Sequence, residues 1–377
     1  MTGPTATAPA GLTFRAFDPT TDYPDAAELV ANCHLHDDLD WLPTPEEFAH
    51  EWRTTTGFDP ASDALVAESA GAMAGLVSVD WRARAAKVVH HVELWVRPDA
   101  RRRGLGRSLL AWAEARARTS VGDGDGGPPD LAHEIGGWGD SEVPGHAELA
   151  AAGGYRVVRY GFEMRRLIAD TIPDVPLPGG LEVRPVRPED HRRIWDADIE
   201  AFADHWEAAK RVEEDFEGWF TAPWLDTSLW QVAWDGDEVA GSVLTSIHRE
   251  ENERLGVRIA WLDHVSVRRP WRQRGLAAAL IASTLELLRH RDADVAALGV
   301  DAENPTGALR LYEKMGFTRH KTGIAYRKSL QARPGLDREP ALPSDPLEPR
   351  SLPADRRKRA VAGQHGEPVV QAAKAVE

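Results

Sequence analysis

The chain repeats one local pattern in both of its halves: a strand-like segment, a basic loop that ends in glycine, and an apolar helix. The first copy reads RPDARRRGLGRSLLAWAEARAR (97–118), and the second reads RRPWRQRGLAAALIASTLELLRHR (268–291). A repeat of this kind predicts a duplicated folding unit rather than one continuous core. The chain has 377 residues, which is enough for two ordinary domains.

The segments around this pattern also repeat in the same order. Each half opens with alternating apolar and polar residues, GLTFRAFDPTTDY from Gly11 and GLEVRPVRPEDHRRI from Gly180. A strand–turn–strand pattern follows in each half, and each half closes with a glycine before an aromatic residue. We therefore favour a duplicated α/β domain. The alternative is that two unrelated α/β domains share these local patterns by chance.

Changes in composition set the expected domain boundaries. We predict a disordered N-terminus at 1–10, a first domain at 11–168 and a second domain at 180–330. The connection at 169–179 is rich in proline, which favours a stiff, extended linker. Residues 331–377 are rich in proline and charge and poor in aromatic residues, which predicts a disordered tail.

Charge limits the classes of partner that the chain can bind. The formal net charge is -15, which argues against general polyanion binding, nucleic acid included. Basic loops in an acidic chain favour one small anionic ligand. The single cysteine, Cys33, excludes an intrachain disulfide and suggests a reducing compartment. Because neither a signal peptide nor a long apolar run is evident, we expect a cytoplasmic protein with no membrane contact, as a monomer or homodimer.

The basic loop has the chemistry of an anion site. WLDHVSV (261–267) alternates like a strand, and LAAALIASTLELLRH from Leu276 consists of good helix formers. The start of a helix offers unpaired N–H groups and the positive end of the helix dipole. Gly275 lets the backbone come close to a bulky anion, so phosphate or pyrophosphate is the natural ligand. The glycine spacings of the P-loop and of the Rossmann fingerprint are absent.

Six residues in each half match the pattern Arg/Gln-x-x-Gly-x-Gly/Ala, namely RQRGLA (272–277) and RRRGLG (101–106). In this strand–loop–helix context, the chain resembles the GNAT superfamily of N-acetyltransferases over 11–168 and 180–330. The resemblance implies an α/β fold of two tandem GNAT-like domains, each with a mostly antiparallel central sheet flanked by helices. It also implies acetyl-CoA as the cosubstrate.

By this resemblance, the loops hold the pyrophosphate of acetyl-CoA, and backbone groups of the preceding strand hold its pantetheine arm. In the second half the implied cofactor-binding residues are Val265, Val267, Arg272, Gln273, Arg274, Gly275, Leu276, Ala277 and Asn304. In the first half they are Arg101, Arg102, Arg103, Gly104, Leu105 and Gly106.

A second match lies near the end of the second half, in DAENPTGALRLYEKMGF (301–317). Its residues predict a helix that starts at Asn304 or Pro305 and stops at Gly316. Asn304 could cap this helix and also bond a ligand amide. The resemblance implies that Tyr312 is the general acid that protonates the leaving thiolate of coenzyme A. The alternative for Tyr312 is a packed aromatic side chain.

The general base is expected on the strand before the basic loop, by the same resemblance. Strand alternation predicts that Asp263 shares a face with Val265 and Val267, whereas His264 points with Ser266. Asp263 is therefore the first choice for the base and His264 the second. The alternative for Asp263 is an exposed carboxylate at the end of a strand.

The two halves differ at the predicted acid. Aligning LYEKMGF with LAAAGGY puts Ala150 opposite Tyr312, and Glu142 or a neighbour stands where the second half has Asn304. We therefore expect a first half that only binds cofactor or only supports the fold. Glu93 could act as a base there, and so could His90 or His91, although ordinary strand histidines are the simpler interpretation.

The segment at 194–230 is rich in tryptophan and acidic residues, and it is expected to line the acceptor site. It predicts either an aromatic, anionic cleft for a cationic amine or amphipathic helices with their tryptophans turned inward. The predicted function is acetyl transfer from acetyl-CoA to a primary amine of a small molecule, by direct attack in a ternary complex in the second half. The alternative is a non-catalytic acyl-CoA-binding regulatory protein. No metal site is predicted.

Overall fold

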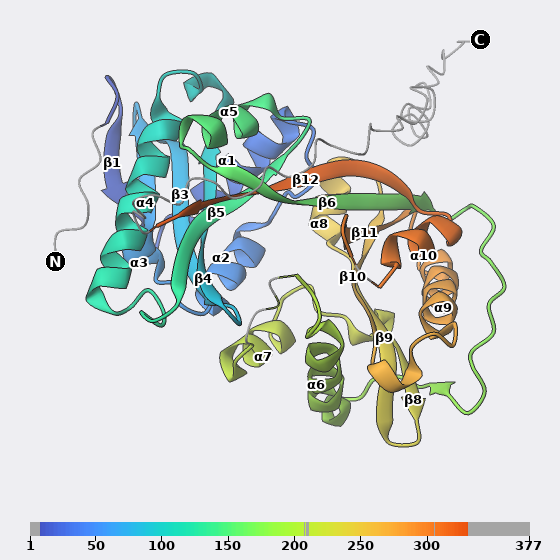
Figure 1. Cartoon of the computed structure of the whole chain (residues 1–377). Coiled ribbons are helices and arrows are strands. Elements are labelled where there is room, and N and C mark those ends of the chain that lie inside the picture. Colours follow the sequence, from blue (N-terminus) through green and yellow to red (C-terminus); the bar gives the residue numbers. More distant parts are fainter. Residues whose placement is uncertain (1–7, 207, 209–210, 305, 331–377) are drawn as a thin grey trace, which may run out of the picture. The chain divides into compact units, whose positions relative to one another are not determined.

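The computed structural model describes residues 8–206, 208, 211–304 and 306–330. The predicted tail at 331–377 and most of the predicted N-terminal segment lie outside these residues. The described strands form a single mixed sheet in the order β1-β2-β3-β4-β5-β12-β6-β11-β10-β9-β8-β7 (Figure 1). The strands of the first half are β1 (Thr13–Ala16), β2 (Ala64–Ser69), β3 (Ala72–Ala83), β4 (Lys87–Val96), β5 (Ala132–Asp140) and β6 (Arg156–Leu167). Those of the second half are β7 (Glu182–Val183), β8 (Gln231–Asp235), β9 (Glu238–Ser246), β10 (Ile259–Val267), β11 (Val295–Asp301) and β12 (Thr318–Ser329).

Neighbouring strands are antiparallel except in two places, where β4 pairs with β5 and β10 pairs with β11 in parallel. The helices are α1 (Tyr23–His36), α2 (Pro45–Thr54), α3 (Pro60–Asp63), α4 (Leu105–Asp123), α5 (Pro144–Ala152), α6 (His191–Phe202), α7 (Glu213–Phe220), α8 (Arg249–Leu255), α9 (Leu276–His290) and α10 (Ala308–Lys314). The predicted fold class, a mostly antiparallel sheet flanked by helices in each half, is confirmed. The helices that follow the basic loops, α4 and α9, begin where the sequence predicts them.

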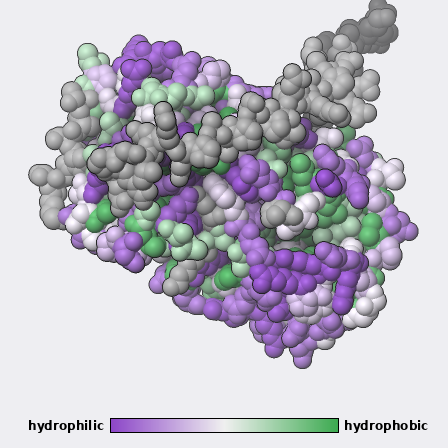
Figure 2. All heavy atoms as spheres, in the orientation of Figure 1, coloured by the Kyte–Doolittle hydropathy of each residue, from purple (hydrophilic) through white to green (hydrophobic). Residues whose placement is uncertain are grey.

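Apolar side chains fill both faces of the sheet in each half. In the second half, α9 packs Leu280, Ile281 and Leu285 into a core with strands β9, β10 and β11. Ile172 and Leu177 of the linker also pack on this core, so the linker is docked along the second half rather than only extended. Hydrophilic side chains cover most of the described surface on the face in Figure 2. None of the helices in the described ranges combines the length and apolar character needed to cross a bilayer.

The last strand of each half pairs with the other half. Strand β12 of the second half lies between β5 and β6 of the first, and β6 in turn pairs with β11. The two long strands run side by side between the halves in Figure 1. The boundaries at 168 and 180 stay a prediction, because each half is completed by a strand of the other.

Strand β5 is pressed closely against the strands on both sides. A Cβ atom added at Gly136 would lie 1.8 Å from the carbonyl oxygen of Tyr326 on β12, and one at Gly137 would lie 2.4 Å from that of Val92 on β4. Only glycine fits at such distances, because the obstacle is backbone that cannot rotate away.

We expect Gly136→Ala to lower the free energy of unfolding by about 3 kcal/mol, as overpacking against rigid neighbours does. Urea denaturation monitored by tryptophan fluorescence measures the change. Gly299→Ala on β11 is the control, because a Cβ added at Gly299 meets nothing within 4 Å. Equal stability of the two variants would show that β5 can shift away from β12.

Candidate functional site

Strands β10 and β11 part at the centre of the second half. They pair only from Ile259 with Val295 to Trp261 with Ala297. Beyond Trp261, β10 continues along β9, whereas β11 continues along β6. The first half has the same parting, since β4 and β5 pair only as far as His91 and Gly136. Each half therefore opens its sheet just before its basic loop.

The two basic loops have the same backbone conformation. A short 3-10 turn precedes each loop, at Pro98–Ala100 and Arg269–Trp271. The φ angle is 86° at Gly104 and 83° at Gly275, and the helix begins at the next residue. The first helical backbone bonds run from Ser108 to Gly104 and from Ala279 to Gly275. The preceding N–H groups point out of each helix start, which fits a phosphate ligand.

The first arginine of each loop fastens the loop to the rest of its half. Arg101 donates to both carboxylate oxygens of Asp37, at 2.6 and 2.7 Å, and to the carbonyl oxygen of Val96 at 2.9 Å. Arg272 likewise donates to the carbonyl oxygen of Val267 at 3.0 Å and to Asp204 at 3.3 Å. Sequence reasoning missed Asp37 and Asp204, because they lie more than sixty residues before the loops and in no motif.

The side chains of the other loop residues differ in their exposure to solvent. The side chains of Leu105 and Leu276 are buried, at 1% exposure each, so only their backbone can face a ligand. Arg103, Gln273 and Arg274 are exposed. Arg102 is exposed as well and forms an ion pair with Glu148 of α5.

Tyr312 lies on α10 with its side chain buried in the core beside Phe317. Burial raises the pKa of its phenol to about 12, so the hydroxyl keeps its proton at neutral pH. The backbone N–H of Phe317 donates to the carbonyl oxygen of Tyr312 at 2.9 Å, and the first half repeats this bond from Tyr155 to Ala150 at 2.9 Å. The geometry therefore agrees with the alignment that puts Ala150 opposite Tyr312.

The predicted start of the helix at Asn304 or Pro305 is wrong. Helix α10 begins at Ala308, because Gly307 takes a left-handed φ of 79° just before it. The side-chain oxygen of Asn304 accepts from the backbone N–H of Thr306 at 2.8 Å, so Asn304 closes a turn and does not cap α10. Because the side-chain oxygen of Asn304 is occupied, the amide nitrogen is the part of this side chain that could donate to a ligand. Pro305 lies outside the described residues.

A β-bulge corrects the predicted face of Asp263. The register of β10 against β9 shifts between Leu262 and His264, so Asp263 is the extra residue. Leu262, Val265 and Val267 consequently all pack on the α9 core, and Asp263 does not share their face. The carboxyl of Asp263 opens to solvent, but the protein around it hinders its solvation and raises its pKa.

Comparison with known proteins agrees with this geometry. The model of the acetyltransferase (GNAT) family matches residues 30–123 and 192–317. The chain belongs to the GNAT acetyltransferase family. It is 33% identical to the mycothiol acetyltransferase of Salinispora arenicola over 313 residues, which cover 82% of this chain and 94% of that protein. It is 34% identical to the mycothiol acetyltransferase of Geodermatophilus obscurus over 244 residues, covering 63% and 73% of the two chains.

Solved structures support the same assignment. A GCN5-related N-acetyltransferase from Sphaerobacter thermophilus has a TM-score of 0.64 and 28% identity, and the match covers 88% of this chain and 99% of that one. A tandem GNAT protein of the clavulanic acid biosynthesis pathway has a TM-score of 0.61 at 19% identity, which shows the fold, with 85% and 99% covered. The predicted tandem GNAT architecture, the N-acetyltransferase activity and acetyl-CoA as cosubstrate are therefore confirmed.

The second candidate base of this GNAT acetyltransferase has a buried partner. His264 Nδ1 lies 2.8 Å from Oδ2 of Asp198 on α6, and the side chain of Asp198 is 1% exposed. The ring of His264 also contacts Phe202 and Trp219, with centroids 5.0 and 4.7 Å away. Sequence reasoning missed Asp198, because it is one acidic residue among many in the acceptor segment.

In the first half, Glu93 occupies the position of His264, three residues before the carbonyl that binds the loop arginine. Burial, together with the nearby carboxyls of Glu51 and Asp80, raises the pKa of Glu93 well above its usual range. A carboxyl with a raised pKa holds its proton more readily than an ordinary glutamate does.

His90 lies in a buried pair with His133. Its Nε2 lies 3.0 Å from Nδ1 of His133, and both residues are buried. Burial, and to a smaller extent His133, lowers the pKa of His90 to about 4 from its ordinary 6.5. These buried surroundings are those expected of an ordinary strand histidine.

Because the folded protein binds this proton less readily than the unfolded chain, stability is expected to fall as the pH drops from about 6.5 to about 4. The loss attributable to His90 is about 3 kcal/mol. Urea denaturation across this range should give a flatter pH profile for His90→Leu than for the unmodified chain. His290→Leu, at an exposed position on α9, is the control. An unchanged profile in His90→Leu would assign the acid sensitivity to other groups.

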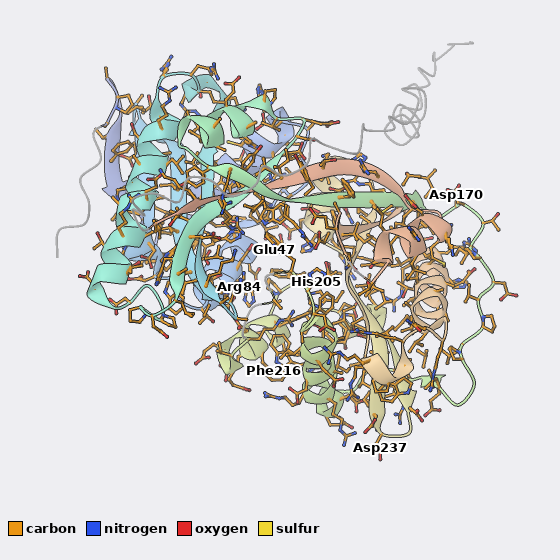
Figure 3. The ribbon with its side chains drawn as sticks, in the orientation of Figure 1. Glu47, Arg84, Asp170, His205, Phe216 and Asp237 are labelled. Carbon is orange, nitrogen blue, oxygen red and sulfur yellow. The ribbon has the colours of Figure 1, made fainter. Side chains whose placement is uncertain are left out.

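A cavity of about 530 Å³ lies next to the parted strands and is lined from both halves. Trp206 and Trp138 meet edge to face there, with ring centroids 6.3 Å apart. Trp261 lines the same cavity, as do His205 and Arg84, which Figure 3 labels. Trp219 instead contacts His264, so the predicted tryptophans of the acceptor segment do not form one group.

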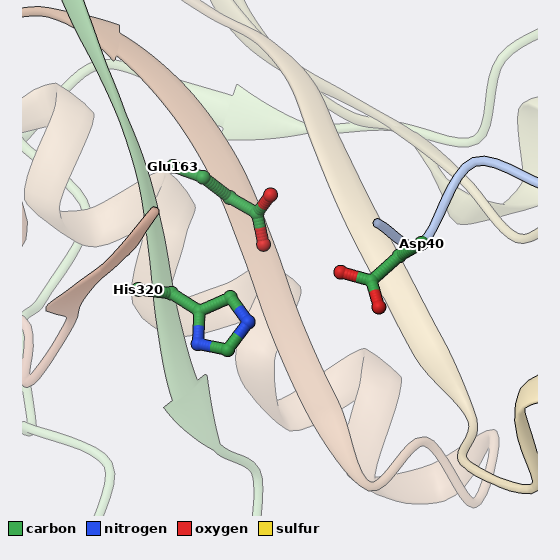
Figure 4. A group of neighbouring side chains, drawn as sticks. All are labelled: Asp40, Glu163 and His320. Atoms are coloured by element: carbon green, nitrogen blue, oxygen red, sulfur yellow. The ribbon is translucent and has the colours of Figure 1, made fainter. Parts of the chain in front are cut away.

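Three potential metal ligands, Asp40, Glu163 and His320, gather where the halves meet (Figure 4). Their carboxylates already have cationic partners. Arg165 pairs with both Asp40 and Glu163, and Lys321 lies 3.1 Å from Asp40. Because these cations balance the acidic charge, the group is best explained as a network of ion pairs that links the first half to β12.

Proposed function

We propose that this GNAT acetyltransferase moves the acetyl group of acetyl-CoA to a primary amine of a small molecule, and that its second half performs the chemistry. The observation that most directly supports this proposal is the buried phenol of Tyr312 on α10, at the position where the first half has Ala150. Both halves keep the phosphate loop, but only one has a hydroxyl at this point of the fold.

In this proposal, the helix starts bind the pyrophosphate of acetyl-CoA. The loop from Arg272 through Ala277 does so in the second half, and the loop from Arg101 through Gly106 keeps the same conformation in the first. Backbone groups of Val265 and Val267 lie on the strand beside the parting and would hold the pantetheine arm. The amide nitrogen of Asn304 is a further donor for that arm.

The reaction is a direct attack within a ternary complex. The amine nitrogen forms a bond to the thioester carbonyl carbon, and the bond from that carbon to sulfur breaks. A base on β10, Asp263 or His264, takes the proton that the amine loses. Tyr312 gives its proton to the leaving sulfur, so the products are the N-acetylated amine and coenzyme A.

The acceptor is proposed to be a small molecule related to mycothiol, because the relatives named above are mycothiol acetyltransferases. The cavity lined by Trp138, Trp206 and Trp261 supports this proposal, since it has room for a small molecule and combines aromatic with charged side chains. The first half is proposed to bind acetyl-CoA without turning it over or to serve only as a support.

The test is release of coenzyme A, followed with a thiol reagent, from the purified protein and acetyl-CoA in the presence of a panel of small primary amines. We expect release that depends on the amine, with one acetylated product detected by mass spectrometry. Binding of acetyl-CoA with no amine-dependent release from any member of the panel would favour the non-catalytic acyl-CoA-binding alternative.

A further inference from the structure

The imidazole of His264 sits directly against the acceptor segment. The bulge at Asp263 turns His264 away from the α9 core, towards α6 and α7. There it contacts Phe202 of α6 and Trp219 of α7. A base at this position lies between the parted strands and the helices proposed to line the acceptor site.

Asp198 is a carboxylate buried under this imidazole. It is 1% exposed, its Oδ2 lies 2.8 Å from His264 Nδ1, and the same oxygen accepts from Arg211 Nη1 at 3.2 Å. Burying a carboxylate is costly unless it has partners, and the histidine and the arginine both offset this cost at Oδ2, whereas Oδ1 has no partner among the described residues. Arg211 is itself stacked on Trp195 and Trp219, which holds this arrangement in place.

The bond to Asp198 determines which ring nitrogen of His264 can act. A carboxylate partner keeps the proton on Nδ1 and leaves the lone pair of Nε2 free to accept another proton. Within the described residues, Nε2 of His264 has no hydrogen-bond partner of its own. The same carboxylate stabilises the imidazolium that forms after proton uptake.

The duplicated fold offers an internal comparison. Asp37 and Asp204 hold the equivalent loop arginines, and counting back six residues from each puts Ala31 opposite Asp198. Both positions are buried on their helices. The first half therefore has the apolar Ala31 where the second half has Asp198 paired with His264. The half that has the pair of His264 and Asp198 is therefore also the half that has Tyr312.

We propose that Asp198 is a positioning residue that presents Nε2 of His264 as the acceptor of the amine proton. This inference rests on the proposed function in the second half. The amine proton passes to Nε2 as the carbon–nitrogen bond forms, Nδ1 keeps its proton on Asp198, and the imidazolium then releases the added proton to water. Among the two candidate bases on β10, the geometry points to His264 rather than Asp263.

The first test needs no acceptor. Ring ¹⁵N spectra of the full chain should show His264 with a protonated Nδ1 and an unprotonated Nε2, assigned by the signal that His264→Ala removes. Asp198→Asn, which is isosteric, should abolish that tautomer preference. A His264 that carries its proton on Nε2 in the unmodified chain would overturn the proposal.

The second test is kinetic and uses the amine that gives the fastest coenzyme A release. Asp198→Asn is expected to lower kcat about 100-fold, without raising KM for acetyl-CoA. In the His264→Ala background, the same substitution should have no further effect, because a residue that acts through His264 has nothing left to position. Asp22→Asn in the first half is the matched control, with unchanged kcat, because it also removes a buried carboxylate that pairs with an arginine.

Two outcomes would count against the inference. Losses that multiply in the double variant would mean that Asp198 acts independently of His264. Normal turnover of His264→Ala beside an inactive Asp263→Asn would assign the base to Asp263. If no amine supports turnover of the unmodified chain, the proposed function fails, while the ¹⁵N spectra still decide whether Asp198 sets the tautomer.

Discussion

Tyr312→Phe is expected to lower the rate of acetyl transfer about 100-fold or more, which is the usual contribution of a general acid. In the proposed mechanism coenzyme A leaves as a neutral thiol rather than as a thiolate, and the variant lacks the hydroxyl that would supply the proton. The ring remains in its place beside Phe317, so acetyl-CoA affinity and stability should change little. Steady-state rates and calorimetric binding of acetyl-CoA measure the two quantities.

Tyr326→Phe is the matched control for this prediction. Tyr326 is also buried, at 9% exposure, but it lies on β12 where that strand pairs with β5. Removing its hydroxyl should leave the rate of transfer within about twofold, because its ring lies against Gly139 of β5 and Tyr326 is not among the residues that line the cavity. Unchanged turnover of Tyr312→Phe would remove Tyr312 from the mechanism and leave it as a packed aromatic side chain.

The raised pKa of Tyr312 also limits how the rate of acetyl transfer can depend on pH. Because burial raises its pKa to about 12, the phenol stays protonated throughout the neutral and mildly alkaline range. The rate should therefore show no decline that belongs to Tyr312 until the pH nears the pKa of its phenol. A decline near neutral pH that disappears in Tyr312→Phe would contradict this assignment.

Local patterns predicted much of this protein. The conformation of a helix start, the need for glycine at a left-handed φ, and the position of Tyr312 against Ala150 each depend on a few neighbouring residues. These features could be inferred from the sequence because duplication gave two copies to compare. The loops at Gly104 and Gly275 are the clearest case, with nearly equal φ angles and the same helix start.

The features that sequence reasoning missed depend on contacts between distant segments or on small changes of register. A single inserted residue at Asp263 reverses the alternation of β10, and alternation alone carries no sign of it. The pairing of β12 with β5 joins residues almost two hundred positions apart. Asp198 is separated from His264 by 66 residues, so its burial under the imidazole appears only in the folded chain.

Gly275→Glu is expected to weaken acetyl-CoA binding in the second half at least about 100-fold, because a carboxylate next to a pyrophosphate places like charges side by side. Transfer activity should fall with it. A Cβ added at Gly275 meets nothing within 4 Å, and a non-glycine residue at its left-handed φ is strained by a modest amount. The protein should therefore fold, and the lost binding should reflect the loop itself.

Gly104→Glu is the matched partner, since Gly104 has the same left-handed φ and equally open surroundings. It adds the same strain and the same charge to the other loop, so differences between the two variants report only the role of each half. Calorimetric titration with acetyl-CoA gives the stoichiometry, and coenzyme A release gives the rate.

We expect Gly104→Glu to keep the transfer rate and Gly275→Glu to lose it. If Gly104→Glu also removes one of two binding sites, the first loop holds acetyl-CoA without turning it over. If instead Gly104→Glu abolishes transfer and Gly275→Glu does not, the chemistry belongs to the first half, and the assignment of Tyr312 fails with it.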